Sequence, residues 1–466
     1  MCLPREKGED KMNRRGFIKR VGAGAGSLVV SQALAAEKEG PPVRNVVLYV
    51  ADDQGMDDAG CYGNPVVRTP GLDALARDGV RFTYAFCTTA SCSPSRSVIL
   101  TGLHNHATGQ YGLAHGYNHF VSFSDVKSLP VLLREAGYRT ACAGKFHVEP
   151  ESAYRFEEYI KGDAPAQMAD QCKPVIAGSD GRPFFLYFCT TEPHRPFRRE
   201  GSTPVDPQDV AVPPYLPDIP ECREELAAYY GSIERCVSGL LRLIEFLKES
   251  GRWDDTLVVY VSDNGAPFPG AKTTLYDPGT RLPCVVRNPF GKRQGYVCNA
   301  MVTWADVTPT ILDFAGLPSD PDAFHGRSFL GAFEEERPAG WDEVYGSHTF
   351  HEVTMYYPMR SIRTRRYKLI WNLAHPLEYP FARDLWESKT WQAALQRGTQ
   401  DYGKRTVSAY LHRPQFELYD LDEDPHEVQN LADDVRHGET LQDLKGKLKR
   451  FQERTKDPWV LKWDRE

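Results

Sequence analysis

The sequence predicts an α/β protein built around a large, mostly parallel β-sheet. Two observations support this fold class. Continuous apolar runs, which are typical of strands buried on both faces, alternate along the chain with segments of helical period. Each run also ends in polar or titratable residues, as strands do at the edge of an open α/β sheet where ligands bind. The 466 residues are enough for a large domain and a smaller one.

The elements of this sheet follow one another in order along the chain. Strands are predicted at residues 45–51, 138–143, 183–188 and 255–261, and helices at residues 71–79, 129–137 and 224–249. The polar residues that follow the four strands are, in order, Asp52 and Asp53, Lys145 and His147, Glu192 and His194, and Asp263 and Asn264. Because open α/β sheets place their sites at the carboxyl ends of the strands, we expect these side chains to form one site.

From about Gly346 onward the pattern changes to that of an antiparallel sheet. Residues 361–371 alternate like an exposed antiparallel strand, residues 416–419 resemble another strand, and a terminal helix is predicted at residues 439–453. We therefore expect a main domain at residues 37–345 and a smaller C-terminal subdomain at residues 346–466.

The N-terminal residues have the order of an export signal, predicted at residues 1–36. A basic stretch is followed by a short apolar run and by SQALAA, which resembles a cleavage site. The pair Arg14-Arg15 before Gly-Phe-Ile-Lys resembles a bacterial twin-arginine signal, which predicts a periplasmic or extracellular protein. The alternative is a disordered basic tail. The apolar run is too short to span a bilayer, and nothing later in the sequence predicts a membrane span.

Charge and cysteine content narrow the classes of function. The net charge of −7 argues against a nucleic-acid-binding protein, although a local pocket can still be positive and bind an anion. The eleven cysteines are scattered, without the regular spacing of a disulfide-stapled fold. We therefore expect at least one unpaired cysteine and expect most of them to be buried as small hydrophobic residues.

One cysteine, Cys92, lies in a motif that is typical of a catalytic site. Cys92-Ser-Pro-Ser-Arg96 is followed by Ser-Val-Ile-Leu-Thr-Gly102, and this run matches the sulfatase signature C-x-P-S-R-x-x-x-L-T-G at every defined position. Pro94 suits the first turn of a helix, whose N-terminus favours an anion such as sulfate. The alternative is a buried or disulfide-bonded Cys92, paired for instance with Cys87, which explains neither the arginine nor the Thr-Gly pair.

The chain therefore resembles the formylglycine-dependent sulfatases of the alkaline phosphatase superfamily. The resemblance implies an alkaline-phosphatase-like sandwich and the conversion of Cys92 to formylglycine by a maturation enzyme. It also implies that the hydrated aldehyde attacks sulfur with one hydroxyl and expels sulfate with the other, which splits one difficult step into two. Finally, it implies one divalent cation, usually Ca²⁺, which prefers hard oxygen ligands. Its ligands would be Asp52, Asp53, Asp263 and Asn264.

The same resemblance gives roles to five further residues. Lys145 and His147 lie in an element like the family's G-K-x-H, and Lys272 lies in an element like its K-x-x-x-Y-x-x-G-x-R. Arg96, Lys145 and Lys272 would bind the charge that develops on the sulfate oxygens. His147 would be the general base and His194 the acid that protonates the leaving group, since histidine titrates near neutral pH.

Longer segments resemble the heparan N-sulfatase group of this family. They include RPFFLYFCTTEPHRPF, SDNGAPFP and, in the C-terminal part, SHTFHEVTMYYPMR. This resemblance implies glucosamine N-sulfate in heparan or heparin fragments as the substrate. Glu192, Arg195, His351 and Glu352 are candidates for contacts with the sugar. Two residues depart from the group, because Lys272 stands where it has an arginine and Glu192 where it has an aspartate.

Three alternatives remain open at this point. An exo-acting O-sulfatase on another sulfated polysaccharide would use the same sulfur chemistry. A phosphonate or phosphodiester hydrolase of the superfamily can share the C-x-P-x-R nucleophile. A non-catalytic glycan-binding relative would retain the pocket. The sequence does not specify an oligomeric state.

Overall fold

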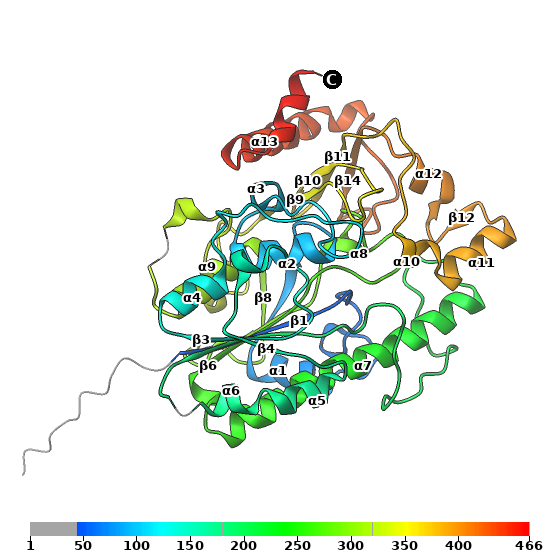
Figure 1. Cartoon of the computed structure of the whole chain (residues 1–466). Helices are drawn as coiled ribbons and strands as arrows, with labels where there is room; N and C mark the ends of the chain where they lie inside the picture. The colour runs from blue at the N-terminus through cyan, green and yellow to red at the C-terminus, as the bar shows by residue number, and fades with distance from the viewer. Residues whose placement is uncertain (1–43, 179, 319, 466) are drawn as a thin grey trace, which may run out of the picture. The chain divides into compact units, whose positions relative to one another are not determined.

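The computed structural model of this chain describes residues 44–178, 180–318 and 320–465. The predicted export signal, at residues 1–36, lies outside them. An eight-stranded sheet in the order β4-β3-β5-β1-β6-β7-β2-β8 forms the centre of the described part (Figure 1). Its strands are β1 (Asn45–Ala51), β2 (Val80–Phe86), β3 (Arg139–Gly144), β4 (Glu158–Ile160), β5 (Phe184–Cys189), β6 (Thr256–Ser262), β7 (Cys284–Arg287) and β8 (Tyr296–Thr303). Neighbouring strands are parallel, except that β7 is antiparallel to β6 and β2.

The sheet is buried on both faces, as its apolar runs predict. Along β1, Val46 and Leu48 belong to one hydrophobic core, while Val47 and Tyr49 belong to the core on the other face. One face is covered by α1 (Pro70–Asp78), α5 (Pro165–Gln171), α6 (Lys173–Ala177) and α7 (Pro220–Glu249), and the other by α2 (Cys92–Thr101), α4 (Leu129–Glu135) and α9 (Val307–Phe314) (Figure 1). The predicted α/β class with a large, mostly parallel sheet is therefore confirmed.

Four strands of the sheet were not predicted from the sequence: β4 at one end, and β7, β2 and β8 at the other. β4 and β7 have only 3 and 4 residues, which is too short for a clear apolar run. In β2 and β8 several side chains are partly exposed, so their apolar runs are interrupted. Continuous apolar runs identify only strands whose two faces are both covered. The four predicted strands, β3, β5, β1 and β6, are instead consecutive neighbours in the sheet and run parallel to one another. Their carboxyl ends therefore lie at one edge, and this edge carries the site.

A second, antiparallel sheet has the order β14-β11-β10-β9. Its strands are β9 (Glu343–His348), β10 (Met359–Thr364), β11 (Tyr367–Asn372) and β14 (Phe416–Asp420). The remaining elements of the C-terminal part are α10 (Arg383–Trp386), α11 (Lys389–Arg397), the two-stranded β12 (Asp401–Tyr402) and β13 (Arg405–Thr406), α12 (Val407–Leu411) and α13 (Gly438–Arg454). The smaller antiparallel sheet and terminal helix are thus confirmed. The division into domains at residue 345 stays a prediction.

The expectation of a single exposed strand at residues 361–371 was wrong. These residues belong to a hairpin of β10 and β11, and both of its faces are buried. Ile362 and Leu369 pack in one core with α13, while Met359 and Ile370 belong to another. Two of the charged residues that suggested an exposed face, Arg363 and Lys368, are instead buried in ion pairs. Lys368, for example, binds both Asp277 and Glu427 at 2.7 Å.

Candidate active site

Cys92 is the first residue of α2, so the sequence motif lies at a helix N-terminus as predicted. Ser91 precedes it in an extended conformation, and Gly102 ends the helix in the left-handed conformation that glycine adopts without strain. Cys92 is 2 % exposed, and its Sγ lies 3.9 Å from Asp53 Oδ1. Burial raises the pKa of this thiol well above its usual value. A buried, protonated thiol is a poor nucleophile, so the unmodified side chain is not suited to attack.

The cysteines of the described part are unpaired. All ten of them are free, and nine are buried, which confirms the expectation of small buried hydrophobic residues. The alternative of a disulfide between Cys92 and Cys87 is therefore wrong. Burial raises the pKa of the Cys87 thiol as well, which leaves that residue chemically inert.

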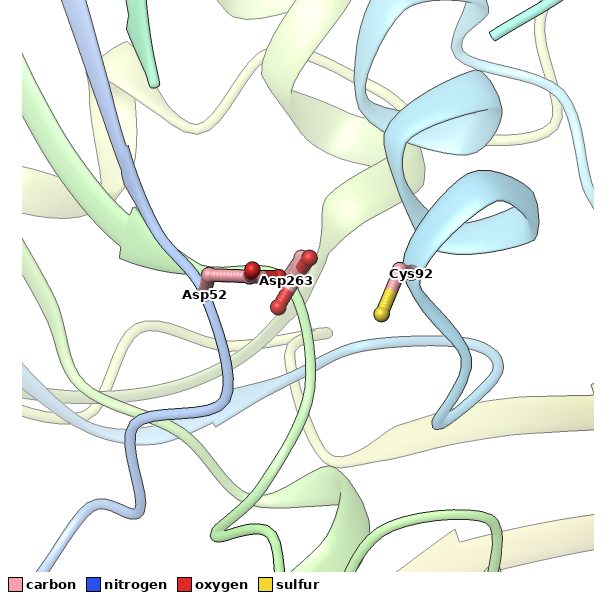
Figure 2. A group of neighbouring side chains, drawn as sticks. All are labelled: Asp52, Cys92 and Asp263. Atoms are coloured by element: carbon pink, nitrogen blue, oxygen red, sulfur yellow. The ribbon is translucent and has the colours of Figure 1, made fainter. Parts of the chain in front are cut away.

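Three carboxylates and an amide gather beside Cys92. Asp52 and Asp53 follow β1, while Asp263 and Asn264 follow the adjacent strand β6. Figure 2 shows the carboxylates of Asp52 and Asp263 facing Cys92, and their ligand atoms and Sγ lie within 4.8 Å of one another. Asp53 joins this group, because its Oδ1 accepts a hydrogen bond from Asn264 Nδ2 at 2.6 Å. All four residues are at most 1 % exposed.

This group fits a hard divalent cation. Asn264 Oδ1 is buried and has no hydrogen-bond partner among the described residues. Burial, together with the neighbouring carboxylates Asp52 and Asp53, raises the pKa of Asp263 to about 7 against the opposing effect of Arg96. A cation between the oxygens would relieve this repulsion and give the amide oxygen a partner, and oxygen ligands of this kind suit Ca²⁺.

Arg96 holds two of these carboxylates from the buried side. Its Nε donates to Asp263 Oδ2 at 2.9 Å and its NH2 to Asp52 Oδ1 at 3.3 Å. A third bond runs from NH1 to the carbonyl oxygen of Lys145 at 3.2 Å. The side chain is completely buried. All three nitrogens of its guanidinium group therefore donate hydrogen bonds within the protein. This arrangement favours a role in positioning the acidic cluster over the direct binding of sulfate that the sequence predicts.

Two lysines reach the same cluster from the pocket side. Lys145 Nζ donates to both oxygens of Asp52 at 2.8 and 2.7 Å, and Lys272 Nζ donates to Asp53 Oδ2 at 2.8 Å. Burial lowers the pKa of each ammonium group, but the facing carboxylates outweigh this effect and raise both pKa values above the usual one. Both lysines therefore stay charged and lie where an anion beside Cys92 would need counter-charges.

Two histidines lie on the same pocket. Burial, and then Lys145 and Arg96, lower the pKa of His147 well below its usual value. His147 is therefore neutral at neutral pH and able to accept a proton. Its Nε2 contacts Nδ1 of His115, while its Nδ1 is buried without a partner among the described residues. His194 Nε2 lies 3.7 Å from Asp53 Oδ2.

Backbone strain marks the site as well. Asp53, His147 and Thr273 adopt positive φ angles of 71°, 55° and 70°. Such conformations cost about 1–3 kcal/mol each in residues other than glycine, and they persist where the surrounding structure holds them. All three are functional candidates or direct neighbours of one, since Thr273 follows Lys272. Three of the six positive-φ residues other than glycine in the described part therefore lie at the site.

These groups open into a pocket of about 730 Å³. The predicted residues that line it are Asp52, Cys92, Lys145, His147, His194, Arg195, Lys272, His351 and Glu352. The carboxyl ends of β1, β3, β5 and β6 have thus brought residues that lie far apart in the sequence to one cavity, as expected.

The four candidates for sugar contacts differ in their surroundings. His351 is buried, and its Nδ1 shares a hydrogen bond of 2.8 Å with Ser91 Oγ; Glu352 lies beside it on the pocket. The guanidinium of Arg195 forms an ion pair with Glu225 at 2.5 Å. The carboxylate of Glu192 is 3.2 Å from Arg235 and almost fully buried. The charged groups of Arg195 and Glu192 are therefore engaged by protein partners.

Among the pocket residues that sequence reasoning missed, His115 and Asp384 contact predicted site residues directly. His115 contacts His147, and Asp384 accepts a hydrogen bond from Lys272 Nζ at 2.9 Å. Neither belongs to a motif or follows a strand of the large sheet. Asp384 lies in the four-residue helix α10, and its carboxylate is brought to Lys272 only by the tertiary structure.

A family model for sulfatases matches residues 44–317, which is more than half of the chain. This chain belongs to the sulfatase family. A second model, described as the C-terminal part of N-sulphoglucosamine sulphohydrolase, matches residues 271–384. The matched ranges include the residues of the acidic cluster, the motif at Cys92 and the pocket residues Lys272, His351, Glu352 and Asp384.

Individual relatives agree with this assignment. The chain is 40 % identical to human N-sulphoglucosamine sulphohydrolase over 461 residues, which covers 90 % of this chain and 91 % of the relative. It is 31 % identical to an ulvan-active sulfatase of Formosa agariphila, covering 83 % and 76 % of the two chains. The family model and the sequences of these relatives thus agree on the sulfatase family.

Solved structures share the fold at lower identity. One, of a protein in complex with its substrate D-glucosamine-2-N,6-O-disulfate, has a TM-score of 0.68 at 21 % identity and covers 89 % of this chain and 98 % of its own. A phosphonate monoester hydrolase of Agrobacterium radiobacter has a TM-score of 0.65 at 20 % identity, covering 89 % and 96 %. These likenesses confirm the predicted alkaline-phosphatase-like architecture.

Proposed function

We propose that this sulfatase hydrolyses the N-sulfate of glucosamine in heparan or heparin fragments. The main support for the proposal is the segment of the chain from which several pocket residues come. Lys272, His351, Glu352 and Asp384 all line the pocket, and all lie within residues 271–384, the segment that resembles the C-terminal part of N-sulphoglucosamine sulphohydrolases. The 40 % identity to the human enzyme of that name, over nearly the whole of both chains, supports the same substrate.

The proposal includes two groups that complete the site. Formylglycine, produced from Cys92 by a maturation enzyme, would supply a hydrated aldehyde as the nucleophile. A Ca²⁺ ion held by Asp52, Asp53, Asp263 and Asn264 would polarise a sulfate oxygen as a Lewis acid. The unpaired oxygen of Asn264 and the like-charge crowding at Asp263 support this ligand set.

The other side chains bind the sulfate and move protons. The ammonium groups of Lys145 and Lys272 bind two sulfate oxygens, where preorganised positive charge stabilises the transition state. His147, which is neutral at neutral pH, would accept the proton of the second hydroxyl at residue 92, the one whose loss of a proton expels sulfate. His194 donates a proton to the nitrogen that leaves. Arg96 keeps Asp52 and Asp263 in place behind the reacting groups.

Sulfate release from defined sugars tests this function. The matured enzyme is incubated with calcium and glucosamine N-sulfate, and in parallel with N-acetylglucosamine 6-O-sulfate and an aryl phosphonate monoester. The proposal expects free sulfate from the first substrate at the highest kcat/KM. Preference for the 6-O-sulfate would assign an O-sulfatase, turnover of the phosphonate would assign the phosphonate hydrolase branch, and no turnover by fully matured protein would leave a glycan-binding relative.

Export completes the proposal. We infer that Arg14 and Arg15 direct a bacterial protein through the twin-arginine route to the periplasm or beyond. Among the described residues, no helix combines the length and apolar character needed to cross a membrane. Replacing both arginines with lysine, which keeps the charge, should retain the precursor inside the cell, and unchanged export measured by fractionation would contradict the assignment.

A further inference from the structure

Asp384 places a carboxylate beside the groups that face the leaving group. Its Oδ2 accepts a hydrogen bond from Lys272 Nζ at 2.9 Å and lies 3.8 Å from His194 Nε2. The side chain is 21 % exposed to the pocket, and its Oδ1 has no hydrogen-bond partner within the described ranges. One carboxylate oxygen is therefore open to a ligand atom that His194 can also reach.

The position of this carboxylate is built into the fold. Glu352 Oε1 accepts a hydrogen bond from the backbone N–H of Arg383, which anchors the start of α10. Glu225, in α7, accepts bonds from the backbone N–H groups of Lys389 and Thr390 at 3.1 and 2.9 Å, which anchor the start of α11. Because Arg195 is the neighbour of His194 and pairs with the same Glu225, the two sides of the pocket are fixed to one support.

The carboxyl group of Asp384 is also held in its ionised form by its neighbours. Burial by itself raises the pKa of this carboxyl, but Lys272, then His194 and His351, outweigh burial and hold the pKa well below its usual range. The group is therefore ionised at neutral pH. An ionised carboxylate accepts hydrogen bonds and attracts cations but repels a lone pair on oxygen.

The chemistry of the two sulfate linkages differs at the bridging atom. A sulfamate has an N–H at that atom, which can donate a hydrogen bond, whereas a sulfate ester has an oxygen without hydrogen. Hydrolysis breaks the N–S bond, leaves its electron pair on nitrogen, adds one proton there and transfers the water oxygen to sulfur, which gives the amine and hydrogen sulfate. The proton of hydrogen sulfate can then pass to the amine, so that the final products are an ammonium ion and sulfate.

We infer that Asp384 is the specificity residue for nitrogen, accepting a hydrogen bond from the sulfamate N–H and binding the ammonium group of the product. The inference rests on the proposed N-sulfatase function and goes beyond it by assigning the residue that distinguishes sulfamate from sulfate ester. Asp384 acts on the bridging nitrogen, while His194 delivers the proton to it.

Equilibrium binding of the products provides a test that does not depend on turnover. Glucosamine, N-acetylglucosamine and inorganic sulfate are titrated into calcium-loaded wild-type protein and into Asp384→Asn, which keeps the size and removes the charge. A charge-assisted hydrogen bond of this kind is worth about a tenfold change in affinity. Glucosamine should therefore bind about tenfold more weakly to Asp384→Asn, while N-acetylglucosamine affinity stays unchanged and sulfate affinity is unchanged or increases.

A matched variant controls for general charge effects. Glu378→Gln removes one negative charge from the segment that leads into α10, from a largely exposed carboxylate outside the pocket that lies 3.8 Å from His412. It should leave the affinity for glucosamine within about twofold, as expected for an exposed pair. Equal weakening of all three ligands by Asp384→Asn would indicate a structural role and overturn the inference. So would equal affinity of the wild type for glucosamine and N-acetylglucosamine.

The ratio of kcat/KM for an N-sulfated sugar to kcat/KM for an O-sulfated sugar distinguishes failure of this inference from failure of the proposed function. In Asp384→Asn, kcat/KM for glucosamine N-sulfate should fall at least tenfold relative to kcat/KM for an O-sulfated sugar. If the wild type hydrolyses the N-sulfate but Asp384→Asn does not change this ratio, the inference fails and the N-sulfatase function stands. If the wild type does not release N-sulfate, the proposed function fails, and the inference fails with it.

Discussion

Glu225 does not line the pocket, but it binds residues on two segments that do or that adjoin it. Replacing Glu225 therefore tests whether these contacts hold the pocket residues in position. Its two carboxylate oxygens accept five hydrogen bonds, two from Arg195 at 2.5 and 3.3 Å and three from Lys389 and Thr390. The side chain is 7 % exposed. The change Glu225→Gln keeps the shape but replaces one acceptor oxygen with an N–H₂ group that faces donors.

The magnitude follows from these contacts. At least two of the five hydrogen bonds are lost, and Arg195 is left without its counter-charge. Breaking a buried ion pair from one side costs about 3–5 kcal/mol. Arg195 is 12 % exposed and also contacts the rings of Phe197 and Phe268, so the lower end applies. We expect a loss of about 3 kcal/mol in the free energy of unfolding. Because the start of α11, directly after α10, and the loop of His194 would move, we also expect a fall in kcat/KM of at least tenfold.

Urea unfolding followed by tryptophan fluorescence measures the stability, and sulfate release from the preferred sugar measures the activity. The control is Glu221→Gln, one turn earlier in α7, whose carboxylate pairs with Arg397 of α11 on the surface. An exposed pair contributes little, so this variant should match the wild type in both assays. A Glu225→Gln variant that is as stable and as active as Glu221→Gln would refute the reasoning.

The difference in unfolding free energy between the wild type and Glu225→Gln should decrease at acidic pH. Burial raises the pKa of Glu225, but the charge of Arg195 and the hydrogen bonds from Arg195 and Thr390 outweigh burial and lower the pKa below its usual value. A carboxyl with a lowered pKa in the folded state contributes stability above its unfolded pKa of about 4.3. The gap in unfolding free energy between wild type and Glu225→Gln should therefore be constant near neutral pH and should narrow as the pH falls through the folded-state value.

Four further predictions follow from the site and its surroundings. Cys92→Ala should abolish sulfate release without changing the unfolding midpoint, and retained turnover would remove the nucleophile assigned here. Asp53→Asn should weaken calcium binding in a titration and lower the rate with it, whereas a wild type insensitive to chelators would contradict the metal site. His194→Ala should reduce turnover of sugars more than of activated aryl sulfates, and equal losses would argue against its role as acid. Arg360→Met breaks a buried pair with Asp457 and should cost about 3–5 kcal/mol in unfolding free energy without changing KM, so an unchanged urea midpoint would show that the pair is dispensable.

The sequence was most informative for the longer strands whose two faces are both covered by helices. Such strands are apolar throughout, so their ends are easy to locate, and the polar residues at those ends must meet at one edge of the sheet. This reasoning predicts that Asp52, Lys145, His194 and Asp263 share one site, as they do in the structure. It failed at residues 361–371, because buried ion pairs such as Lys368 with Asp277 and Glu427 have the same sequence pattern as an exposed face.

The motif at Cys92 likewise predicted the start of a helix correctly, since helix initiation depends on a few adjacent residues. The same motif did not reveal what Arg96 contacts. Its three hydrogen-bond partners come from segments that follow three different strands, and their arrangement depends on how those strands are ordered in the sheet. A residue that holds the acidic cluster and one that clamps sulfate look identical in sequence.

By itself, then, the sequence determined the chemistry of the site: the cysteine motif, the acidic ligands, and the lysines and histidines at successive strand ends. These features depend on short motifs and on runs of apolar residues, and both can be recognised in the amino-acid sequence alone. Only the tertiary structure decided that Asp384 faces Lys272 across 112 positions of sequence, and that Glu225 ties α11 to the loop of His194. Contacts of this kind arise from the packing of whole elements and are not encoded by any short run of residues.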